Sequence, residues 1–444
     1  MSGSVQPSPP STPDLLPGGP RLYTIPPSAP FLTTLAKAIL RGDLPMPRGA
    51  KPDPLALPLT TIYLPTRRAA RALREAFLAE AGSEALLLPR IRALGDPDEE
   101  AAMIFDPGDG AEEDAAIGAP VIGALPRRLT LMKLVLALSR RLQQEAVADR
   151  SVEGPAILSV TPGQACYLAA DLARLMDDVE REEVDLSKLA AIVPEDFAAR
   201  WQVTLDFLKI VTEHWPDHLE ENGLVSPIAR RTVLMAFETE RLAQGSPYPV
   251  IAAGSTGTVP ATTRLLKTIA SLPNGAVVLP GLDLSLDGES WSMLGDHPEH
   301  PQAGVAELLR KIGVERKDVA YLPGSEPNPA ARARLHLVSE ALRPAESTEH
   351  WQRFLGADGL SPEGRASFAN ALAGIRAIVA PTAHDEAEAI ALILKSVIET
   401  PGKTAALVTP DRVLARRVAA RLKRYDLTID DSAGVPVALS LIHI

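Results

Sequence analysis

The chain has 444 residues, enough for two to four domains, and its apolar content of 46% can bury a sizeable core. The formal net charge of -11 excludes a generally basic nucleic-acid coat and leaves room for a local basic surface. The single cysteine, Cys166, excludes an intrachain disulfide framework and an all-cysteine metal cluster. No apolar run could span a bilayer, and the N-terminus lacks the features of a secretory signal, so we expect a cytoplasmic protein.

Residues 1–20 are rich in Pro, Ser and Gly and are predicted to form a disordered tail. Residues 21–25 then predict a strand, residues 26–30 a loop, and the apolar spacing from Phe31 to Leu40 a helix. A phosphate-binding loop would stand between this strand and this helix. The loop here, PPSAP, has no glycine and no lysine, and its three prolines lack N–H donors. We therefore interpret it as a P-loop position that cannot hold ATP.

A Gly-Lys-Thr triplet at Gly402, Lys403 and Thr404 also suggests an ATP site. It follows a predicted helix and precedes a predicted strand, which reverses the order that a P-loop requires. We therefore interpret the triplet as structural.

Residues 60–65 predict a second strand, and Thr66 can cap the helix predicted over residues 67–79. Its inward positions are Ala70, Leu73 and Phe77. Most of the opposite side is basic, with Arg67, Arg68, Arg71 and Arg74. In an acidic protein this pattern indicates an anion-facing surface; the alternative is an ordinary solvated basic face.

Residues 86–94 predict a buried apolar run, and the acidic, glycine-containing residues 95–120 a mobile loop. From residue 130 to residue 243 the apolar period is helical almost throughout, with Cys166 on an expected buried face. The expected core stripes are Leu131, Leu134, Val135 and Leu138; Tyr167, Leu168, Leu172, Leu175 and Met176; and Trp201, Leu205, Leu208 and Ile210.

A strand–helix–strand crossover is predicted over residues 250–279, with strands at 250–253 and 276–279 and a helix at 260–272. The loop of residues 254–258 follows the first strand. Loops at the carboxyl ends of parallel strands commonly bind ligands, so Ser255, Thr256 and Thr258 are candidate binding residues. The alternative is that this loop is only a tight turn.

Two further motifs suggest metal sites. His297 and His300, with Glu299 between them, are flanked by prolines that forbid the regular helix an aligned pair would need. The triplet from Glu315 to Lys317 has the Glu-x-Lys form of restriction-type nucleases, but its flanks are charged rather than an apolar strand. We reject both and expect no metal site.

Late in the chain, residues 375–380 and 405–408 predict strands and residues 385–399 a helix. Thr409, Pro410 and Asp411 then cap an arginine-rich helix over residues 412–423. This repeats the arrangement of residues 60–79. Two such units, one per half, fit a pair of RecA-like domains.

Residues 254–283, the His-Pro-x-x-Pro-Gln-x-Gly pattern at 297–304, and residues 386–434 resemble the AddB family. These proteins are the second subunit of the AddAB helicase–nuclease, which processes double-strand DNA breaks for homologous recombination. The likeness extends over nearly all of residues 23–437. It implies an α/β fold: a RecA-like, superfamily-1 helicase-like but ATP-inactive parallel sheet domain with an all-helical insertion, then a truncated second RecA-like domain.

The resemblance also implies domain boundaries and partners. The first RecA-like domain would comprise residues 21–129 and 246–370, the helical insertion residues 130–245, and the start of the second domain residues 371–438. An AddA-type helicase–nuclease subunit, double-stranded DNA ends and single-stranded DNA would be the partners. The DNA-facing candidates are Thr66, Arg67, Arg68, Arg71, Ser255, Thr256 and Thr258.

No catalytic or nucleotide-binding residue is assigned. The iron–sulfur cluster and magnesium of the family belong to a C-terminal nuclease domain that this chain lacks, so no cofactor is expected. Residues 439–444 depart from the family and match the in-frame translation of a transposon end used to fragment DNA for sequencing. We therefore expect a fragment whose true sequence breaks off near Ala438.

Two alternatives stay open. One is an α/β enzyme that binds a nucleotide at residues 254–258, although a GxGxxG motif and an acidic ribose partner are lacking. The other is an interaction scaffold that does not contact DNA.

Overall fold

The computed structural model describes residues 20–45, 55–82, 86–94, 119–148, 160–186, 207–355, 362–432 and 434. The chain divides into two compact units, Met1–Ala371 and Leu372–Ile444, and each is described by itself. The predicted tail before residue 20, nearly all of the predicted acidic loop, and the six C-terminal residues lie outside the described residues.

A six-stranded, all-parallel sheet forms the centre of the first unit, in the order β3-β2-β4-β5-β1-β6. Its strands are β1 (Leu22–Ile25), β2 (Thr61–Leu64), β3 (Arg90–Ala93), β4 (Val250–Ala253), β5 (Gly275–Pro280) and β6 (Ala320–Tyr321). All residues of β4 are buried, as are those of β5 before its final proline, which is typical of strands covered on both faces. The prediction of an α/β fold with a parallel sheet is confirmed.

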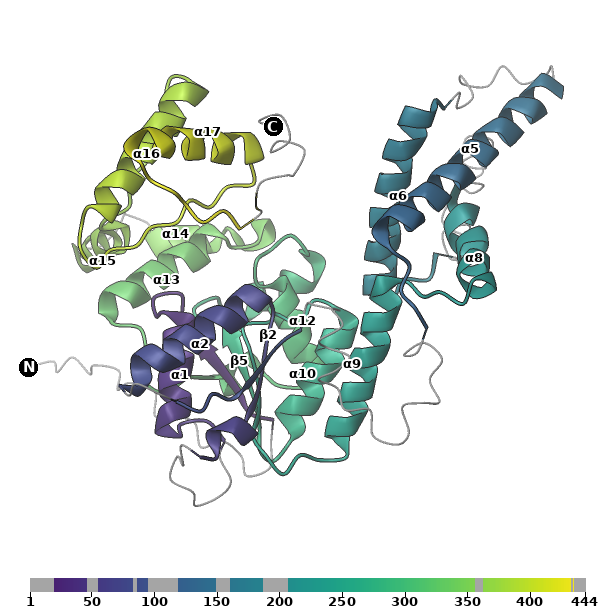
Figure 1. Ribbon diagram of the computed structural model, residues 1–444. Coiled ribbons are helices and arrows are strands. Elements are labelled where there is room, and N and C mark those ends of the chain that lie inside the picture. Colours follow the sequence, from purple (N-terminus) through teal and green to yellow (C-terminus); the bar gives the residue numbers. More distant parts are fainter. Residues whose placement is uncertain are drawn as a thin grey trace, which may run out of the picture. The chain divides into compact units, whose positions relative to one another are not determined.

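One face of the sheet is covered by α1 (Phe31–Arg41) and α2 (Arg67–Ala81), which pack against each other (Figure 1). Their apolar positions follow the helical period, with Leu35 and Ile39 on α1 and Leu73 and Phe77 on α2 all buried. These side chains share a core with alternate residues of the strands, which include Ile25, Ile62, Leu64, Ile251 and Val278.

The opposite face is covered by α9 (Pro227–Ala243), α10 (Pro260–Ser271) and α12 (Ala303–Ile312). Leu265, Leu266 and Ile269 of α10 are buried with Leu308 of α12. The predicted crossover is therefore confirmed, since β4, α10 and β5 follow one another and the two strands pair in parallel. The prediction of a buried run at residues 86–94 is wrong in part, because this run contains β3, which lies at the edge of the sheet and is only half-buried.

The described residues between β3 and β4 are mostly helical. They form α5 (Ala124–Ala148), α6 (Pro162–Glu182), a π-helical turn at Ile210–His214, and α8 (Trp215–Glu221), followed by α9. We call α5, α6, the π-helical turn and α8 the helical segment. Its core contains Leu131, Val135, Ala165, Ala169, Leu172, Met176, Ile210 and Trp215.

The predicted buried stripe on α6 is wrong in part. Tyr167 is 74% exposed and Leu175 42% exposed, and Cys166 is half-buried rather than buried. The face that packs on α5 is centred instead on Ala165 and Ala169, whose small side chains let the two helices approach closely.

The first unit contains further elements between and after the strands of the sheet. The helices are α11 (Gly288–Met293), α13 (Pro329–Ala341), α14 (His350–Leu355) and α15 (Pro362–Leu372). The 3-10 turns of this unit are at Leu57–Leu59, Leu294–Asp296, Arg316–Asp318 and Ala345–Ser347.

The second unit contains α16 (Ala383–Ile398), α17 (Arg412–Leu422) and a 3-10 turn at Lys423–Tyr425. Ala387 and Ala391 of α16 pack against Leu414, Val418 and Leu422 of α17. The helix predictions here are confirmed, and Asp411 caps α17 by accepting hydrogen bonds from the main-chain N–H groups at 413 and 414.

The strands predicted at residues 375–380 and 405–408 are wrong for the structure. Neither segment pairs with another among the described residues, and Val379 and Val408 are 96% and 92% exposed. An extended segment becomes a strand only with a hydrogen-bonded neighbour, and apolar composition alone does not supply one.

Candidate nucleic-acid interface

The carboxyl edge of the sheet is where the two predicted groups of site residues meet. Because all six strands are parallel, their carboxyl ends and the loops that follow lie at one edge. Thr66 and Arg67 follow β2, and the loop of residues 254–258 follows β4. Strands β2 and β4 are direct neighbours, with Ile62 opposite Ile251. Two groups that lie far apart in the sequence therefore flank the same point of the sheet.

The two loops approach each other closely at Gly254. Its φ of +77° lies in the left-handed region that favours glycine, and its N–H donates to the Val278 carbonyl at 2.9 Å. A Cβ here would stand 3.4 Å from Phe31 Cε1 and 3.5 Å from Pro65 Cδ. The start of α1, the end of β2 and the end of β4 are thus packed together at the edge.

The first turn of α2 is basic where helices usually prefer acidic residues. Thr66 caps the helix as predicted, its Oγ1 accepting from the Ala69 N–H at 3.1 Å. Arg67, Arg68 and Arg71 are exposed, and the turn contains no acidic residue. Positive side chains at the positive end of the helix dipole cost about 0.3–1 kcal/mol each, a cost that a bound anion would offset. Arg67 and Arg68 also have interactions within the chain.

The loop after β4 is a braced turn. Ser255 Oγ accepts from the Gly257 N–H at 3.3 Å, and Thr263 Oγ1 of α10 donates to the Gly257 carbonyl at 2.6 Å. Gly257 is buried at φ +64°, and a Cβ there would lie only 2.7 Å from Leu308 Cδ1. The alternative interpretation of this loop as a tight turn is therefore correct for its conformation.

The braced loop still offers hydrogen-bond donors at the edge. Ser255 and Thr256 are half-buried and Thr258 is exposed. The main-chain N–H groups of Ser255 and Thr256 have no acceptor among the described residues. Two adjacent N–H groups and three hydroxyls near a basic helix terminus are suited to an anionic oxygen.

The loop between β1 and α1 has few donors. Ala29 donates its N–H to the Pro26 carbonyl at 3.0 Å, and Pro27 packs beside Gly281, where a Cβ would stand 3.1 Å from Pro27 Cγ. The three prolines contribute no N–H groups. With few N–H donors, no glycine and no lysine, this loop lacks the parts of an ATP-binding loop.

The histidines considered for a metal site are used in other ways. His297 Nδ1 lies 3.2 Å from Glu299 Oε1, and its Nε2 lies 2.8 Å from Glu346 Oε2. The hydrogen bond to Glu299 raises the pKa of His297. His300 Nδ1 accepts from the Gln302 N–H at 3.1 Å. Among the described residues no three His, Cys, Asp or Glu side chains are placed to share a metal ion.

Gln302, from the same motif, braces the loop that follows β5. Its side chain accepts from the Asp283 N–H at 3.0 Å and donates to the Gly281 carbonyl at 3.1 Å. Buried Thr24 adds a hydrogen bond from the Leu282 N–H to its Oγ1 at 3.0 Å. Gln302 and Thr24 therefore stabilise this edge of the sheet, although neither was among the candidate binding residues.

A buried polar network that the sequence did not reveal joins β2 and β3 to α9. The hydroxyl of Tyr63 donates to Glu238, whose carboxylate also accepts two hydrogen bonds of 2.7 Å from Arg241. Arg92 of β3 lies 3.5 Å from the same carboxylate. Burial, with the charge of Glu238 beside it, raises the pKa of Tyr63. The only sequence signal was the i, i+3 spacing of Glu238 and Arg241, which is too common to indicate burial.

Within the described part of the chain, no helix combines the length and the apolar composition needed to cross a membrane. A scan against protein-family models and a search of curated proteins found no match to the chain.

Proposed function

We propose that the chain is an AddB-type subunit of an ATP-dependent helicase–exonuclease, which processes double-strand breaks together with an AddA-type partner. The long likeness of residues 254–283 and 386–434 to that family supports the proposal. An all-parallel sheet with helices between β3 and β4 is compatible with a RecA-like domain that carries a helical insertion at residues 130–245. The second unit would begin a second RecA-like domain.

The carboxyl edge of the sheet is proposed to contact the DNA backbone. The observation that carries this proposal is the meeting of the basic first turn of α2 with the loop of residues 254–258, across the paired strands β2 and β4. Arg67, Arg68 and Arg71 would neutralise phosphates, and Ser255, Thr256 and Thr258 would donate hydrogen bonds to them. Contacts of this kind position a protein on DNA without reading its sequence.

The described residues would supply DNA contact and scaffold rather than a chemical step. The loop between β1 and α1 contains neither the lysine nor the glycines of an ATP site. ATP hydrolysis would then come from the AddA-type partner. Iron–sulfur and magnesium chemistry would belong to the nuclease domain of the family.

Binding of a blunt-ended DNA duplex by the full chain tests this proposal. The double variant Arg67→Ala, Arg68→Ala is expected to bind about tenfold or more weakly at low salt. The slope of log K against log salt should become shallower by roughly 0.9 for each phosphate that the variant no longer neutralises. Fluorescence anisotropy over a salt series measures both quantities.

The matched control is Arg310→Ala, Lys311→Ala. Both residues are exposed in the last turn of α12, and the first turn of this helix packs beside Thr258. The control therefore removes the same amount of charge at the opposite end of the helix. Equal weakening by the two double variants would show a nonspecific effect of charge. Unchanged binding by the first variant would remove the edge from the DNA interface, and the absence of DNA binding by the unaltered chain would favour the scaffold alternative.

A further inference from the structure

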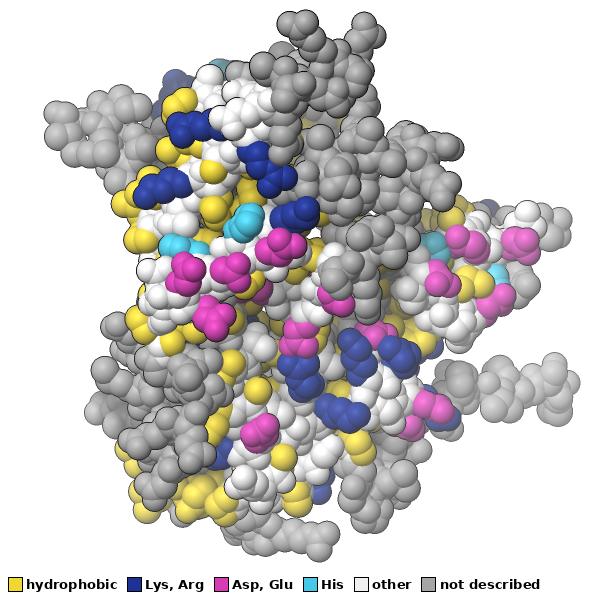
Figure 2. Space-filling model, turned by 90° about the vertical axis from the view of Figure 1, so that its right-hand side faces the viewer, with side chains coloured by type: hydrophobic (Ala, Val, Ile, Leu, Met, Phe, Trp, Pro, Cys, Tyr) yellow, Lys and Arg dark blue, Asp and Glu magenta, His cyan; other side chains and the backbone are white. Residues whose placement is uncertain are grey.

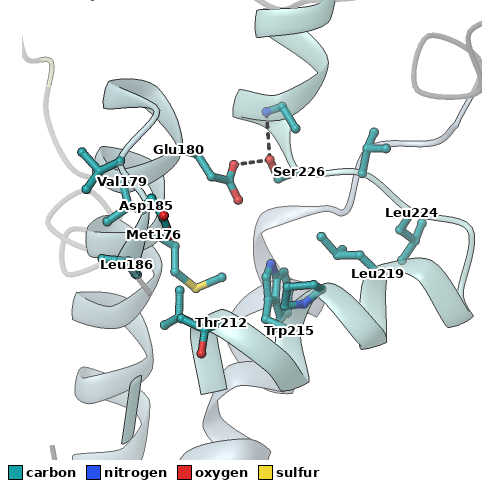
Figure 3. A pocket seen from close by; sticks show the side chains of 15 residues that line it. Met176, Val179, Glu180, Asp185, Leu186, Thr212, Trp215, Leu219, Leu224 and Ser226 are labelled. Atoms are coloured by element: carbon teal, nitrogen blue, oxygen red, sulfur yellow. Dashed lines mark hydrogen bonds between the residues drawn. The ribbon is translucent and has the colours of Figure 1, made fainter. Parts of the chain in front are cut away.

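A pocket of about 540 Å³ lies in the helical segment, between the end of α6 and α8 (Figure 3). Its walls are mainly aliphatic, with one aromatic ring. The apolar residues that line it include Met176, Val179, Val184, Leu186, Val211, Trp215, Leu219, Leu224 and Val225. Its lining includes none of the candidate DNA-facing residues, so it requires its own explanation.

Two polar groups face each other across these apolar walls. Figure 3 shows Glu180 on one side of the pocket and the indole of Trp215 on the other. The Glu180 carboxylate accepts a hydrogen bond from Ser226, the N-cap of α9, and burial raises the pKa of Glu180. The pocket is therefore a structured site in which α6 is joined to the start of α9.

The indole N–H of Trp215 has no acceptor among the described residues, although the residue is only 2% exposed. Buried donors are nearly always paired in native proteins. An acceptor oxygen of a ligand in this pocket would satisfy the unpaired donor.

The surroundings of the pocket are acidic. Asp185 is exposed and lines the pocket, and exposed carboxylates adjoin lining residues in the sequence, among them Glu213, Asp217 and Glu220. Figure 2, which looks onto this side of the molecule, shows acidic side chains gathered in a row, with hydrophobic surface, histidines and Lys or Arg side chains beside it. Such a rim attracts cations and repels the phosphates of a nucleic acid.

We propose that this pocket docks a segment of a partner protein in which an aliphatic side chain is flanked by lysine or arginine. The aliphatic side chain would fill the space between Met176 and Leu219. The Trp215 N–H would donate to a main-chain carbonyl of the segment, and the acidic rim would hold the flanking basic residues. A nucleobase fits less well, because the walls offer aliphatic carbon rather than stacking surfaces and the rim opposes its phosphate.

A set of fluorescein-labelled heptapeptides tests the proposal with the full chain. The sequence is Lys-Lys-Ser-X-Ser-Lys-Lys with X as Leu, Met or Ala, and a second set carries Glu in place of Lys. The Leu and Met peptides are expected to bind about tenfold more tightly than the Ala peptide. The Glu-flanked peptides should bind at least about tenfold more weakly than their Lys-flanked counterparts, and binding should weaken with salt.

Variants locate the binding. Val184→Arg places a bulky cation at the pocket, and because Val184 is 53% exposed the fold tolerates it. This variant should lower affinity for the Leu peptide about tenfold or more. Val338→Arg, on α13 at 46% exposure, is the matched control and should leave affinity unchanged. Trp215→Phe keeps a ring and removes the N–H, and should also weaken binding.

Three results would overturn the proposal. One is equal affinity for the Leu and Ala peptides or for Lys and Glu flanks. Another is unchanged peptide binding by Val184→Arg. The third is a DNA duplex that competes with the Leu peptide for the unaltered chain and loses affinity in Val184→Arg, because the pocket would then be a nucleic-acid site.

Discussion

Replacing Gly275 by alanine is expected to lower the free energy of unfolding of the first unit by about 3 kcal/mol or more. Gly275 begins β5 directly after α10, and its N–H donates to the Leu272 carbonyl at 3.0 Å. A Cβ at this position would lie 1.8 Å from the Ile269 carbonyl oxygen and 2.9 Å from Leu272 Cβ. The closest obstacle is main chain of the preceding helix, so relief would require α10 and β5 to separate.

Gly288→Ala is the matched control for this effect. Gly288 is the first residue of α11, and apart from its chain neighbours and the backbone of α11, no described atom lies within 4 Å of the position that its Cβ would take. The change should be neutral or slightly stabilising, because alanine favours the helix. Urea unfolding followed by circular dichroism compares the two variants. Equal stability of Gly275→Ala and the unaltered chain would mean that α10 and β5 do not meet as described.

Replacing Arg343 by methionine is expected to lower the free energy of unfolding of the first unit by about 3 kcal/mol. The Arg343 side chain is 3% exposed and forms ion pairs with Glu340 and Asp287. Its Nη1 also donates to Ser290 Oγ at 2.6 Å. Methionine fills similar space and leaves the buried Glu340 carboxylate without its cation. We expect the lower end of the range for broken buried pairs, because Asp287 keeps about a third of its side chain in solvent.

Arg310→Met is the control, because Arg310 and Glu307 have the same i, i+3 spacing at 72% and 43% exposure. Removing the Arg310 side chain should lower the free energy of unfolding by less than about 1 kcal/mol. Chemical unfolding of both variants measures the difference. Similar costs for the two would show that the Arg343 cluster is not buried.

The Arg343 effect should depend on pH. Burial raises the pKa of Asp287, but hydrogen bonds from Ser290 and Arg343 outweigh it and hold the pKa well below the usual range. A carboxyl with a lowered pKa stabilises the fold above its unfolded pKa of about 3.8 and loses that stabilisation as the pH falls. The difference in the free energy of unfolding between the unaltered chain and Arg343→Met should therefore be largest at pH 7 and decrease below about pH 4. A gap that stays constant into strong acid would exclude Asp287 as a partner.

Much of the sheet could be predicted from local pattern. Short apolar runs bounded by turn residues located β1, β2, β4 and β5, and Thr66 was recognisable as a cap because a hydroxyl precedes an apolar helical repeat. The strand order could not be predicted, because it depends on which strands pair across long gaps in the sequence. The same reason explains residues 375–380 and 405–408, which have strand composition and no pairing partner among the described residues.

The sequence predicted the two groups of candidate site residues separately and did not predict that they lie together. The arginines of α2 and the loop after β4 were each visible in the sequence, and only the pairing of β2 with β4 shows that they adjoin. The pocket beside Trp215 had no sequence signal, because a buried indole without an acceptor resembles any core tryptophan until its neighbours are known.

Site-specific photocrosslinking tests most directly whether the carboxyl edge of the sheet contacts DNA. A benzophenone amino acid replaces Thr256, half-buried at the edge, and in a control chain replaces Val338 on α13. Irradiation with a labelled blunt-ended duplex is expected to crosslink the chain altered at Thr256 well above the chain altered at Val338, and salt should suppress the product. Equal or absent crosslinking from the two positions, while the DNA is bound, would place the interface elsewhere on the protein.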